Sequence, residues 1–431
     1  MTYGETLDFL FGSLADFQRV GADAYKPGLE RVEIFNNYLG NPDRKFKTIH
    51  VAGTNGKGSV SHILASILQA AGYRTGLFTS PHLKDFRERI RVNGRPIPEA
   101  EVVKFTAGHR DKMVAMGLSF FEMTVGMALS YFAREKVDIA IIEVGLGGRL
   151  DATNIIRPVL GIITNIGLDH TSLLGDSIEA IAAEKGGIIK PSVPTVIGEH
   201  DYESDAVFKN IAMERNGNLF FAQDIYHVAG ARHEDDCQIF TIEERGGGGT
   251  GIEVSLDLLG HYQSRNIITV MAALNILNRT ASIKTDIPAV LKGCRSVVAS
   301  TSLLGRWQIL GSEPLTVCDT GHNEHGIRQV VRQIKEQRYG RLFMVIGFVS
   351  DKDVAKMLSI LPCEAYFIFT RASIERAMPA EVLALKAAEY GLCGEAISDA
   401  GAALSRACEL ATPNDMIFIG GSNFVVAEIL P

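Results

Sequence analysis

Apolar residues recur along the chain in two alternating patterns, short continuous runs and longer stretches with helical spacing. The run 49–52 ends at a glycine-rich loop, and the apolar residues after that loop have the spacing of one buried helix face: Ile63, Leu64, Ile67, Leu68 and Ala71. Further apolar runs at 74–79, 138–144 and 159–165 and a helical stretch at 123–135 continue the alternation. Such alternation predicts a mostly parallel sheet with helices on both faces.

The pattern changes twice after this first unit. Short β-type runs lie within residues 220–259, and the four-glycine run 246–249 is predicted to be a hairpin tip because no lysine, hydroxyl and helix follow it. A polar stretch near 294–302 indicates a linker. Strands and helices then alternate again, which predicts a smaller Rossmann-like sheet. The predicted organisation is an ATPase-like α/β domain with a phosphate loop at 1–297, a linker at 298–303 and a C-terminal α/β domain at 304–431.

The loop after the first apolar run has the features of a phosphate-binding loop. Glycines let backbone N–H groups close around phosphate oxygens, the following helix adds its positive end, and Lys57 supplies a charge for the β- and γ-phosphates. The spacing departs from the common G-x-x-x-x-G-K-[ST] form, because Gly53 and Gly56 are three apart and Gly58 separates Lys57 from Ser59. The order of strand, glycines, lysine, hydroxyl and helix still predicts a nucleotide site.

Polar residues follow several of the predicted strands, where the carboxyl ends of parallel strands meet at one edge of a sheet. They include Ser80, Glu143 and the pair Asp169-His170. A carboxylate at the end of a buried strand beside a nucleotide loop suits Mg²⁺, which takes one or two protein oxygens together with phosphate oxygens and water. Glu143 is therefore a predicted magnesium ligand, and the alternative is a carboxylate that caps the next turn. A lone histidine such as His170 is more often structural, and Lys185 by itself would be a solvated charge.

Composition and charge narrow the class of protein. The 431 residues are 46% hydrophobic with a formal net charge of −7, which favours an ordinary globular protein and disfavours nucleic acid as a partner. No basic leader or membrane-length apolar run is visible, so we expect a cytoplasmic protein without membrane association. Six cysteines without a C-x-x-C pair indicate neither a disulfide framework nor a zinc site.

Several ordered motifs resemble the folylpolyglutamate synthase/dihydrofolate synthase branch of the Mur ligase family. The resemblance covers nearly the whole chain. Its motifs are HVAGTNGKGS at 50–59, TSPHL at 79–83, FFE at 120–122, EVGLGGRLDATN at 143–154, LDHT at 168–171, GHYQSRN at 260–266, LGR at 304–306 and DTGHN at 319–323. Many family members have D-x-A-H-N-P where this chain has Asp319-Thr320-Gly321-His322-Asn323-Glu324.

The resemblance implies an ATP-dependent ligase that activates a pteroate or folate carboxylate as an acyl phosphate and joins it to L-glutamate. It implies ATP and two Mg²⁺ ions as cofactors. The implied ATP-binding residues are Thr54, Asn55, Gly56, Lys57, Gly58, Ser59, Asn266, Arg306 and Asp319. The implied metal ligands are Ser80, Glu143, His170 and Lys185, the last as a carbamate, and the implied catalytic residues are Lys57, Lys185, His170, Arg306 and His322.

The acceptor site is implied by the same resemblance. Its candidates are Lys26, Gly28, Ser119, Phe121 and Asp151. The phosphate loop and Arg306 fall in different predicted domains, so we expect the domains to close around ATP and exclude water from the acyl phosphate. The small-molecule partners would be dihydropteroate or a reduced folate, with L-glutamate, and the protein is expected to be a monomer.

Two other functions stay open at this stage. A sister Mur ligase that acts on a cell-wall nucleotide precursor would share the loop, the metal ligands and the lysine. The run 143–154 and the roughly fifty residues before the loop, too few for a uridine-nucleotide domain, favour the folate reading. A nucleotide-binding protein without ligase activity is the other alternative. The motifs do not decide between dihydrofolate synthase, folylpolyglutamate synthase and both, and we lean toward a bifunctional enzyme on the resemblance alone.

Overall fold

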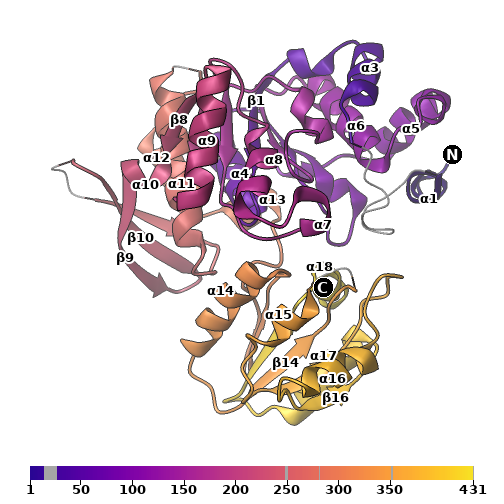
Figure 1. The fold of residues 1–431 in the computed structure, drawn as a ribbon, viewed down its shortest axis with the longest axis vertical. Coiled ribbons are helices and arrows are strands. Elements are labelled where there is room, and N and C mark those ends of the chain that lie inside the picture. Colours follow the sequence, from indigo (N-terminus) through magenta and orange to yellow (C-terminus); the bar gives the residue numbers. More distant parts are fainter. Residues whose placement is uncertain (14–26, 248–250, 281, 351–352, 431) are drawn as a thin grey trace. The chain divides into compact units, whose positions relative to one another are not determined.

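The computed structural model describes residues 1–13, 27–247, 251–280, 282–350 and 353–430. These form two compact units (Figure 1). The first unit comprises residues 1–257 and 262–303, and the second comprises 258–261 and 304–431.

The first unit is built on an eight-stranded sheet in which most neighbouring strands are parallel. The order is β4-β3-β2-β5-β1-β6-β7-β8, and only the β2–β3 and β3–β4 pairs are antiparallel. The strands are β1 (Lys47–Ala52), β2 (Thr75–Phe78), β3 (Ile90–Val92), β4 (Arg95–Pro96), β5 (Ile139–Glu143), β6 (Leu160–Ile163), β7 (Pro194–Ile197) and β8 (Asn218–Phe221). The predicted α/β sheet is confirmed, and the runs near 74–79, 138–144 and 159–165 are β2, β5 and β6.

Helices cover both faces of this sheet. The helices and 3₁₀ turns of the unit are α1 (Tyr3–Ser13), α3 (Glu30–Tyr38), η2 (Pro42–Arg44), α4 (Lys57–Ala70), η3 (Phe86–Arg89), α5 (Glu99–Ala115), α6 (Phe120–Arg134), η4 (Ala152–Ile155), α7 (Thr171–Leu174), α8 (Ile178–Gly186), α9 (Tyr202–Arg215), α10 (Ala222–Ile225), α11 (Gln263–Arg279), α12 (Ile287–Cys294) and α13 (Val297–Thr301). Helix α4 packs on β1, β2 and β5 and against α11 and α12.

The strand register shows which helices cover the face of the sheet opposite α4. The register aligns His50 with Ile142 and Ala52 with Ile163, so these side chains share one face of the sheet. Ile142 belongs to the buried core formed with α6, whereas Ala52 and Ile163 belong to the core under α8 and α9. The face that carries His50 is therefore covered by α6 at one side and by α8 and α9 at the other.

A small antiparallel sheet completes the first unit. Its order is β11-β10-β9, with β9 (Tyr226–Glu234), β10 (Cys237–Glu244) and β11 (Ile252–Leu256). The four-glycine run lies between the paired strands β10 and β11, and residues 248–250 of that run are outside the described residues.

Most of the predicted linker at 298–303 is helical in the structure. Residues 297–301 form helix α13, because the Asp257 carboxylate accepts the N–H groups of Val297 and Val298 and satisfies the start of the helix. At its end, Thr301 Oγ1 lies 2.8 Å from His62 Nδ1 of α4. Conversely, residues 258–261 belong to the second unit, although the sequence placed them in the first domain.

The second unit is a smaller α/β fold with a six-stranded sheet. The order is β12-β13-β17-β14-β15-β16, parallel except for the β12–β13 pair. The elements are β12 (Gln308–Ser312), β13 (Leu315–Cys318), α14 (Glu324–Lys335), β14 (Leu342–Ile346), α15 (Val354–Leu358), β15 (Tyr366–Phe369), α16 (Ala380–Ala388), β16 (Gly394–Ala396), α17 (Ala400–Leu410), β17 (Met416–Gly420) and α18 (Asn423–Ile429). The predicted smaller α/β unit is confirmed, and β12 and β16 are strands that the sequence pattern did not indicate.

Candidate active site

The glycine-rich loop joins β1 to α4, as the sequence predicts. Gly56 is the N-cap of α4 with φ +83°, a left-handed conformation that only glycine adopts readily. A Cβ atom at this position would lie 2.4 Å from Asn266 Oδ1 at the start of α11. The structure therefore brings Asn266, a predicted ATP-binding residue, directly against the loop.

A segment after β6 holds the loop in place. Asn165 accepts the Asn55 N–H through its side-chain oxygen and the Thr54 N–H through its backbone oxygen, both at 2.9 Å. Thr164 Oγ1 donates to the Asn55 carbonyl at 2.6 Å, and the Thr54 hydroxyl lies between the N–H and C=O groups of Gly167. The sequence reasoning missed Thr164 and Asn165, whose position at a strand end was the available signal.

Lys57 and Ser59 lie in the first turn of α4. Lys57 Nζ donates to the carbonyls of Gly53 and Thr54 at 2.9 and 3.1 Å, so its charge lies over the loop. Buried Ser59 accepts from Gln263 Nε2 at 3.2 Å, and Gln263 Oε1 accepts from Asn266 Nδ2 at 2.7 Å. Gln263, also missed from the sequence, connects the loop hydroxyl to Asn266.

Glu143 and Ser80 meet at the carboxyl ends of neighbouring strands. Glu143 ends β5 and is only 4% exposed, and its Oε2 accepts the backbone N–H of Ser80 at 3.2 Å. Because Val51 of β1 pairs with Glu143, the carboxylate stands beside the strand that leads into the loop. Two of the predicted metal ligands are thus adjacent.

Lys185 is buried in the last turn of α8. Its pKa is lowered from 10.5 to about 7, mainly by burial and secondly by the charge of Lys57, while Asp169 and Asp151 act in the opposite direction. The lysine of the loop and the lysine of α8 are therefore close enough to repel each other. Lys185 is only 4% exposed, so the alternative of a solvated surface charge is wrong.

His170 begins α7 in a left-handed conformation, with φ +51°. Its own backbone N–H donates to Asp169 Oδ1 at 2.8 Å, and its Nε2 lies 3.9 Å from Asp169 Oδ2. A non-glycine residue in this region of φ/ψ space is uncommon and is often found at a functional site. Asp169, which also acts on Lys185, joins His170 to the same part of the unit.

The donors here fit a divalent cation bound together with a nucleotide. Across the described residues, no group of three or more His, Cys, Asp and Glu side chains could hold a metal ion by itself. Glu143 and Ser80 offer a carboxylate and a hydroxyl, a donor set that suits Mg²⁺ when phosphate and water oxygens complete the shell. The residues present therefore fit a nucleotide-bound ion better than a protein-only metal cage.

The predicted acceptor residues lie on several different elements, and one of them is outside the described residues. Ser119 caps α6, since its hydroxyl accepts the Glu122 N–H at 3.2 Å and the Glu122 carboxylate accepts the Ser119 N–H at 2.7 Å. The ring of Phe121 lies against Gly145 in the loop after Glu143. Gly28 precedes α3 with φ +116°, and Lys26 is outside the described residues.

Both carboxylate oxygens of Asp151 accept hydrogen bonds from backbone N–H groups nearby in the sequence. The carboxylate caps η4 by accepting from the Thr153 N–H at 2.9 Å, and its other oxygen accepts the Leu146 N–H at 2.8 Å. Burial raises its pKa, and these hydrogen bonds oppose that rise. Asp151 is also close enough to Lys185 for its charge to act on the pKa of that lysine. These contacts indicate a residue that supports the site rather than one that is free to bind the acceptor.

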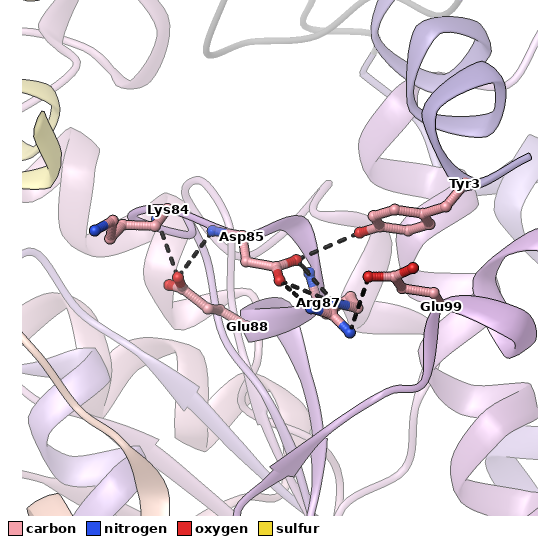
Figure 2. A network of polar contacts seen from close by, with 6 residues as sticks. All are labelled: Tyr3, Lys84, Asp85, Arg87, Glu88 and Glu99. Atoms are coloured by element: carbon pink, nitrogen blue, oxygen red, sulfur yellow. Dashed lines mark hydrogen bonds and ion pairs between the residues drawn. The ribbon is translucent and has the colours of Figure 1, made fainter. Parts of the chain in front are cut away.

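A polar network links residues of the segment after Ser80 to one another and to α1 (Figure 2). The Glu88 carboxylate accepts three consecutive backbone N–H groups, those of residues 83–85, at 2.9–3.0 Å. Figure 2 shows the two from Lys84 and Asp85. Asp85 receives the Arg87 side chain and, at 3.3 Å, the hydroxyl of Tyr3 from α1. Arg87 also lies 3.4 Å from Glu99. Helix α1 is thus tied to the segment that follows the predicted metal ligand Ser80.

In the second unit, the predicted residues lie where one loop is joined to the end of β13. Arg306 donates to the Gly305 carbonyl at 3.2 Å and to the Thr320 hydroxyl. Asp319 accepts the Trp307 N–H at 2.8 Å, and His322 Nδ1 lies 3.0 Å from the Thr320 carbonyl. Arg306, Asp319 and His322 therefore belong to one cluster within this unit.

A glycine-rich loop at a helix start, with a buried lysine and a strand-end glutamate beside it, defines a nucleotide-binding α/β protein. The chain matches the Mur ligase middle domain over residues 51–274 and the Mur ligase glutamate ligase domain over residues 305–423. The middle-domain match contains the phosphate loop, and the glutamate-ligase match contains the Arg306 cluster.

Similar proteins specify the branch. The dihydrofolate synthase/folylpolyglutamate synthase of Bacillus subtilis is 35% identical over 376 residues, which cover 81% of this chain and 84% of that protein. A probable bifunctional folylpolyglutamate synthase/dihydropteroate synthase of Haloferax volcanii is 34% identical over 99% of this chain, which spans 50% of that longer protein. The structure of Escherichia coli FolC in complex with DHPP and ADP has a TM-score of 0.85 and 29% identity, with 100% of this chain and 97% of that chain covered. The chain belongs to the folylpolyglutamate synthase/dihydrofolate synthase branch of the Mur ligase family.

Proposed function

We propose that this protein uses ATP to join the carboxylate of a pteroate or folate to the amine of L-glutamate. The observation that carries the proposal is the grouping of Lys57, buried Lys185 and the Glu143–Ser80 pair around one loop of the first unit. Family membership supports it, as do two solved relatives, FolC with DHPP and ADP and a bifunctional enzyme with Mn, AMPPNP and L-glutamate bound.

The loop supplies the binding site for the ATP phosphates in this proposal. Backbone N–H groups of residues 56–59 and the positive end of α4 bind phosphate oxygens, while the N–H groups of Thr54 and Asn55 stay bonded to Asn165. Lys57 leaves the carbonyls of Gly53 and Thr54 and pairs with the β- and γ-phosphates, which offer it stronger acceptors. Asn266 contacts the nucleotide from α11, and the hydroxyl of Ser59 turns toward the metal–phosphate complex.

The proposed metal ligands are Glu143, Ser80 and His170, with phosphate and water oxygens. When bound, Mg²⁺ neutralises phosphate charge and aligns the γ-phosphate with the attacking carboxylate. Two Mg²⁺ ions are proposed, since the substrate carboxylate and the transferring phosphoryl group both carry negative charge.

Lys185 is proposed to carry a carbamate. The amine adds to CO₂ only in its neutral form, Lys–NH₂ + CO₂ → Lys–NH–COO⁻ + H⁺, and burial beside Lys57 lowers its pKa to about 7. The product replaces a cation that repels Mg²⁺ with an anionic oxygen ligand. An unmodified ammonium in the same place would oppose metal binding.

The reaction then has two steps. A carboxylate oxygen of the acceptor attacks the γ-phosphorus of ATP, the bond to ADP breaks, and an acyl phosphate forms. The amine of L-glutamate attacks the acyl carbon, loses a proton and displaces phosphate to leave an amide. Arg306, Asp319 and His322 of the second unit are proposed to act on the nucleotide and the phosphoryl group, where a cation stabilises developing charge.

The deciding experiment is ADP release by the purified protein with ATP, Mg²⁺ and L-glutamate, with dihydropteroate and tetrahydrofolate compared as acceptors. Turnover with both acceptors supports a bifunctional enzyme, and turnover with one identifies the single activity. UDP-muramoyl substrates serve as the control for a cell-wall ligase, and glutamate-independent ADP release with every acceptor would contradict ligase activity.

Oligomeric state and location are also part of the proposal. Within the described residues, no helix is long and apolar enough to cross a membrane. We propose a cytoplasmic monomer that acts on small molecules. Size-exclusion chromatography with light scattering and fractionation of the source cells test these two points.

A further inference from the structure

Three buried side chains form a hydrogen-bonded row beneath the candidate active site. His50 Nε2 lies 2.9 Å from Thr153 Oγ1, and Thr153 Oγ1 lies 2.5 Å from Asp151 Oδ1. His50 and Thr153 are fully buried, and Asp151 is 4% exposed. His50 belongs to β1, which leads into the phosphate loop, while the other two residues begin η4.

Hydrogen-bond chemistry fixes the direction of this row. A carboxylate only accepts, so the Thr153 hydroxyl donates to Asp151 and its free lone pair accepts from His50. The pKa of His50 is lowered to about 3, mainly by burial and secondly by the charge of Lys190, so the ring is neutral. Because Thr153 Oγ1 accepts from His50, the single ring proton is on Nε2. The other ring nitrogen, Nδ1, has no hydrogen-bond partner in the described part of the chain. The ring therefore directs its one hydrogen bond at Thr153.

The far end of the row holds the loop after Glu143. Asp151 Oδ2 accepts the Leu146 N–H at 2.8 Å, and the Gly145 N–H also stabilises this carboxylate. The near end adjoins the phosphate loop, since Val51 follows His50 and pairs with Glu143. The row thus connects the strand that carries the phosphate loop to the loop that follows the glutamate.

We propose that His50 and Thr153 are positioning residues that hold Asp151, and through it the loop 144–148, in the geometry that binds a divalent metal with its nucleotide. The proposal deepens the function proposed above and rests on it for the identity of the ligand. Groups that orient the residues around a metal typically change its affinity about 10–100-fold when they are removed.

The test compares four variants of the full chain. Thr153→Val keeps the size of the side chain and removes the hydroxyl, whereas Thr153→Ser keeps the hydroxyl. His50→Leu breaks the row at its other end. Thr195→Val is the matched control, because Thr195 is a buried strand threonine whose hydroxyl has no hydrogen-bond partner among the described residues.

Two readouts separate positioning from general damage. Amide hydrogen exchange measures the Leu146 N–H, and we expect Thr153→Val and His50→Leu to accelerate it about 10-fold or more. Mn²⁺ titration in the presence of AMPPNP, a non-hydrolysable ATP analogue, should show about 10-fold weaker metal binding in the same two variants. Thr153→Ser and Thr195→Val should match the wild type in both measurements.

Unchanged exchange at Leu146 and unchanged Mn²⁺ binding in Thr153→Val and His50→Leu would overturn the proposal. So would equal losses in Thr195→Val, because any removed hydroxyl would then have the same effect. A wild-type protein without glutamate-dependent turnover would instead contradict the proposed function, and the exchange measurement would still decide whether the row holds the loop.

Discussion

The ring of Phe121 lies directly against Gly145, so closely that a Cβ atom at position 145 would be 2.4 Å from the ring. Phe121 is in the first turn of α6, and Gly145 is in the loop after the strand-end Glu143. The contact joins a predicted acceptor residue to the loop of a predicted metal ligand. The absence of a side chain at position 145 is what permits it.

Gly145→Ala is therefore expected to displace either the ring or the loop. Overpacking of this kind costs about 1–3 kcal/mol of stability, and we expect kcat/KM for the acceptor to fall about 10-fold or more. Thermal unfolding and steady-state kinetics measure the two effects. The double variant Gly145→Ala/Phe121→Leu removes the ring and should recover stability. A double variant no more stable than Gly145→Ala would show that the ring is not the source of the strain.

The proposed carbamate on Lys185 predicts that enzyme activity depends on CO₂ and on pH. With a pKa of about 7, the amine is about nine-tenths protonated at pH 6 and about nine-tenths neutral at pH 8. Enzyme depleted of CO₂ should regain activity on addition of bicarbonate, and about 10-fold faster at pH 8 than at pH 6 at equal dissolved CO₂. Lys185→Met should lose about 100-fold or more in kcat and gain nothing from bicarbonate. Activity that is insensitive to CO₂ removal would contradict the carbamate.

The same burial has a consequence for stability. In the unfolded chain the lysine has a pKa of about 10.4, so between about pH 7 and pH 10 unfolding takes up a proton. Stability should therefore rise with pH in this window, and unmodified Lys185 should destabilise the fold most below pH 7. In CO₂-free buffer, Lys185→Met is expected to unfold at a higher temperature than the wild type, with the larger difference at pH 6. Calorimetry at pH 6 and pH 9 measures this difference.

Much of the fold could be predicted because the signals were local. The runs at β1, β5 and β6 are short, apolar and bounded by turn residues, and α4 shows one apolar face. Strand β12 is antiparallel at a sheet edge and partly exposed, so its sequence lacks the continuous apolar run of a central strand. Helix α13 depends on a carboxylate forty residues earlier, Asp257, which no local pattern reveals.

The candidate site likewise has features that local sequence predicts and features that depend on the folded structure. The loop and Glu143 follow from strand ends and glycine spacing. The lowered pKa of Lys185 depends on burial and on Lys57, more than a hundred residues away, so sequence alone could not indicate it. The hydroxyl of Ser119 was expected at the acceptor pocket, whereas the structure uses it as a helix cap, for which the S-x-x-E spacing of Ser119 and Glu122 was the available signal.

The network around Glu88 predicts a stiff segment after Ser80 (Figure 2). One carboxylate accepts three consecutive N–H groups, and an amide in its place would offer only one oxygen and present an N–H₂ group to Leu83. Glu88→Gln should accelerate hydrogen exchange at residues 83–85 about 10-fold. Glu99→Gln is the control, since the side chain of Glu99 is 51% exposed and its ion pair with Arg87 contributes little. Equal exchange in both variants would show that Glu88 does not stiffen the segment.

Asp415 is predicted to stabilise the second unit through its hydrogen bonds. It precedes β17 and accepts from the backbone and side chain of both Arg341 and Thr412, at 2.7–2.9 Å. Burial opposes ionisation of this carboxylate, but the hydrogen bonds outweigh it and hold its pKa well below the usual value. Asp415→Asn should destabilise the protein by about 1–3 kcal/mol at pH 7.

The pH dependence of that effect has a definite sign. A depressed folded-state pKa contributes stability above the unfolded value of about 3.9, and this contribution is lost as pH falls. The difference between the wild type and Asp415→Asn should therefore shrink below about pH 4. Denaturant unfolding at pH 7 and pH 3.5 measures it, and a difference that stays constant or grows at low pH would contradict the role given to the ionised carboxylate.

Gly56 allows two separate costs to be measured at one position. Alanine there must adopt φ +83°, which costs roughly 1–2 kcal/mol, and its methyl carbon would also lie 2.4 Å from Asn266 Oδ1. Gly56→Ala should weaken ATP binding about 10-fold or more, as measured by calorimetric titration. Asn266→Gly removes the obstructing amide, so the double variant keeps only the backbone strain and the loss of the Asn266 contact. If Asn266 obstructs the methyl group, the effects of the two substitutions will be less than additive. Strict additivity would show that the amide moves aside freely, and the left-handed backbone alone would then explain why glycine is required at the head of α4.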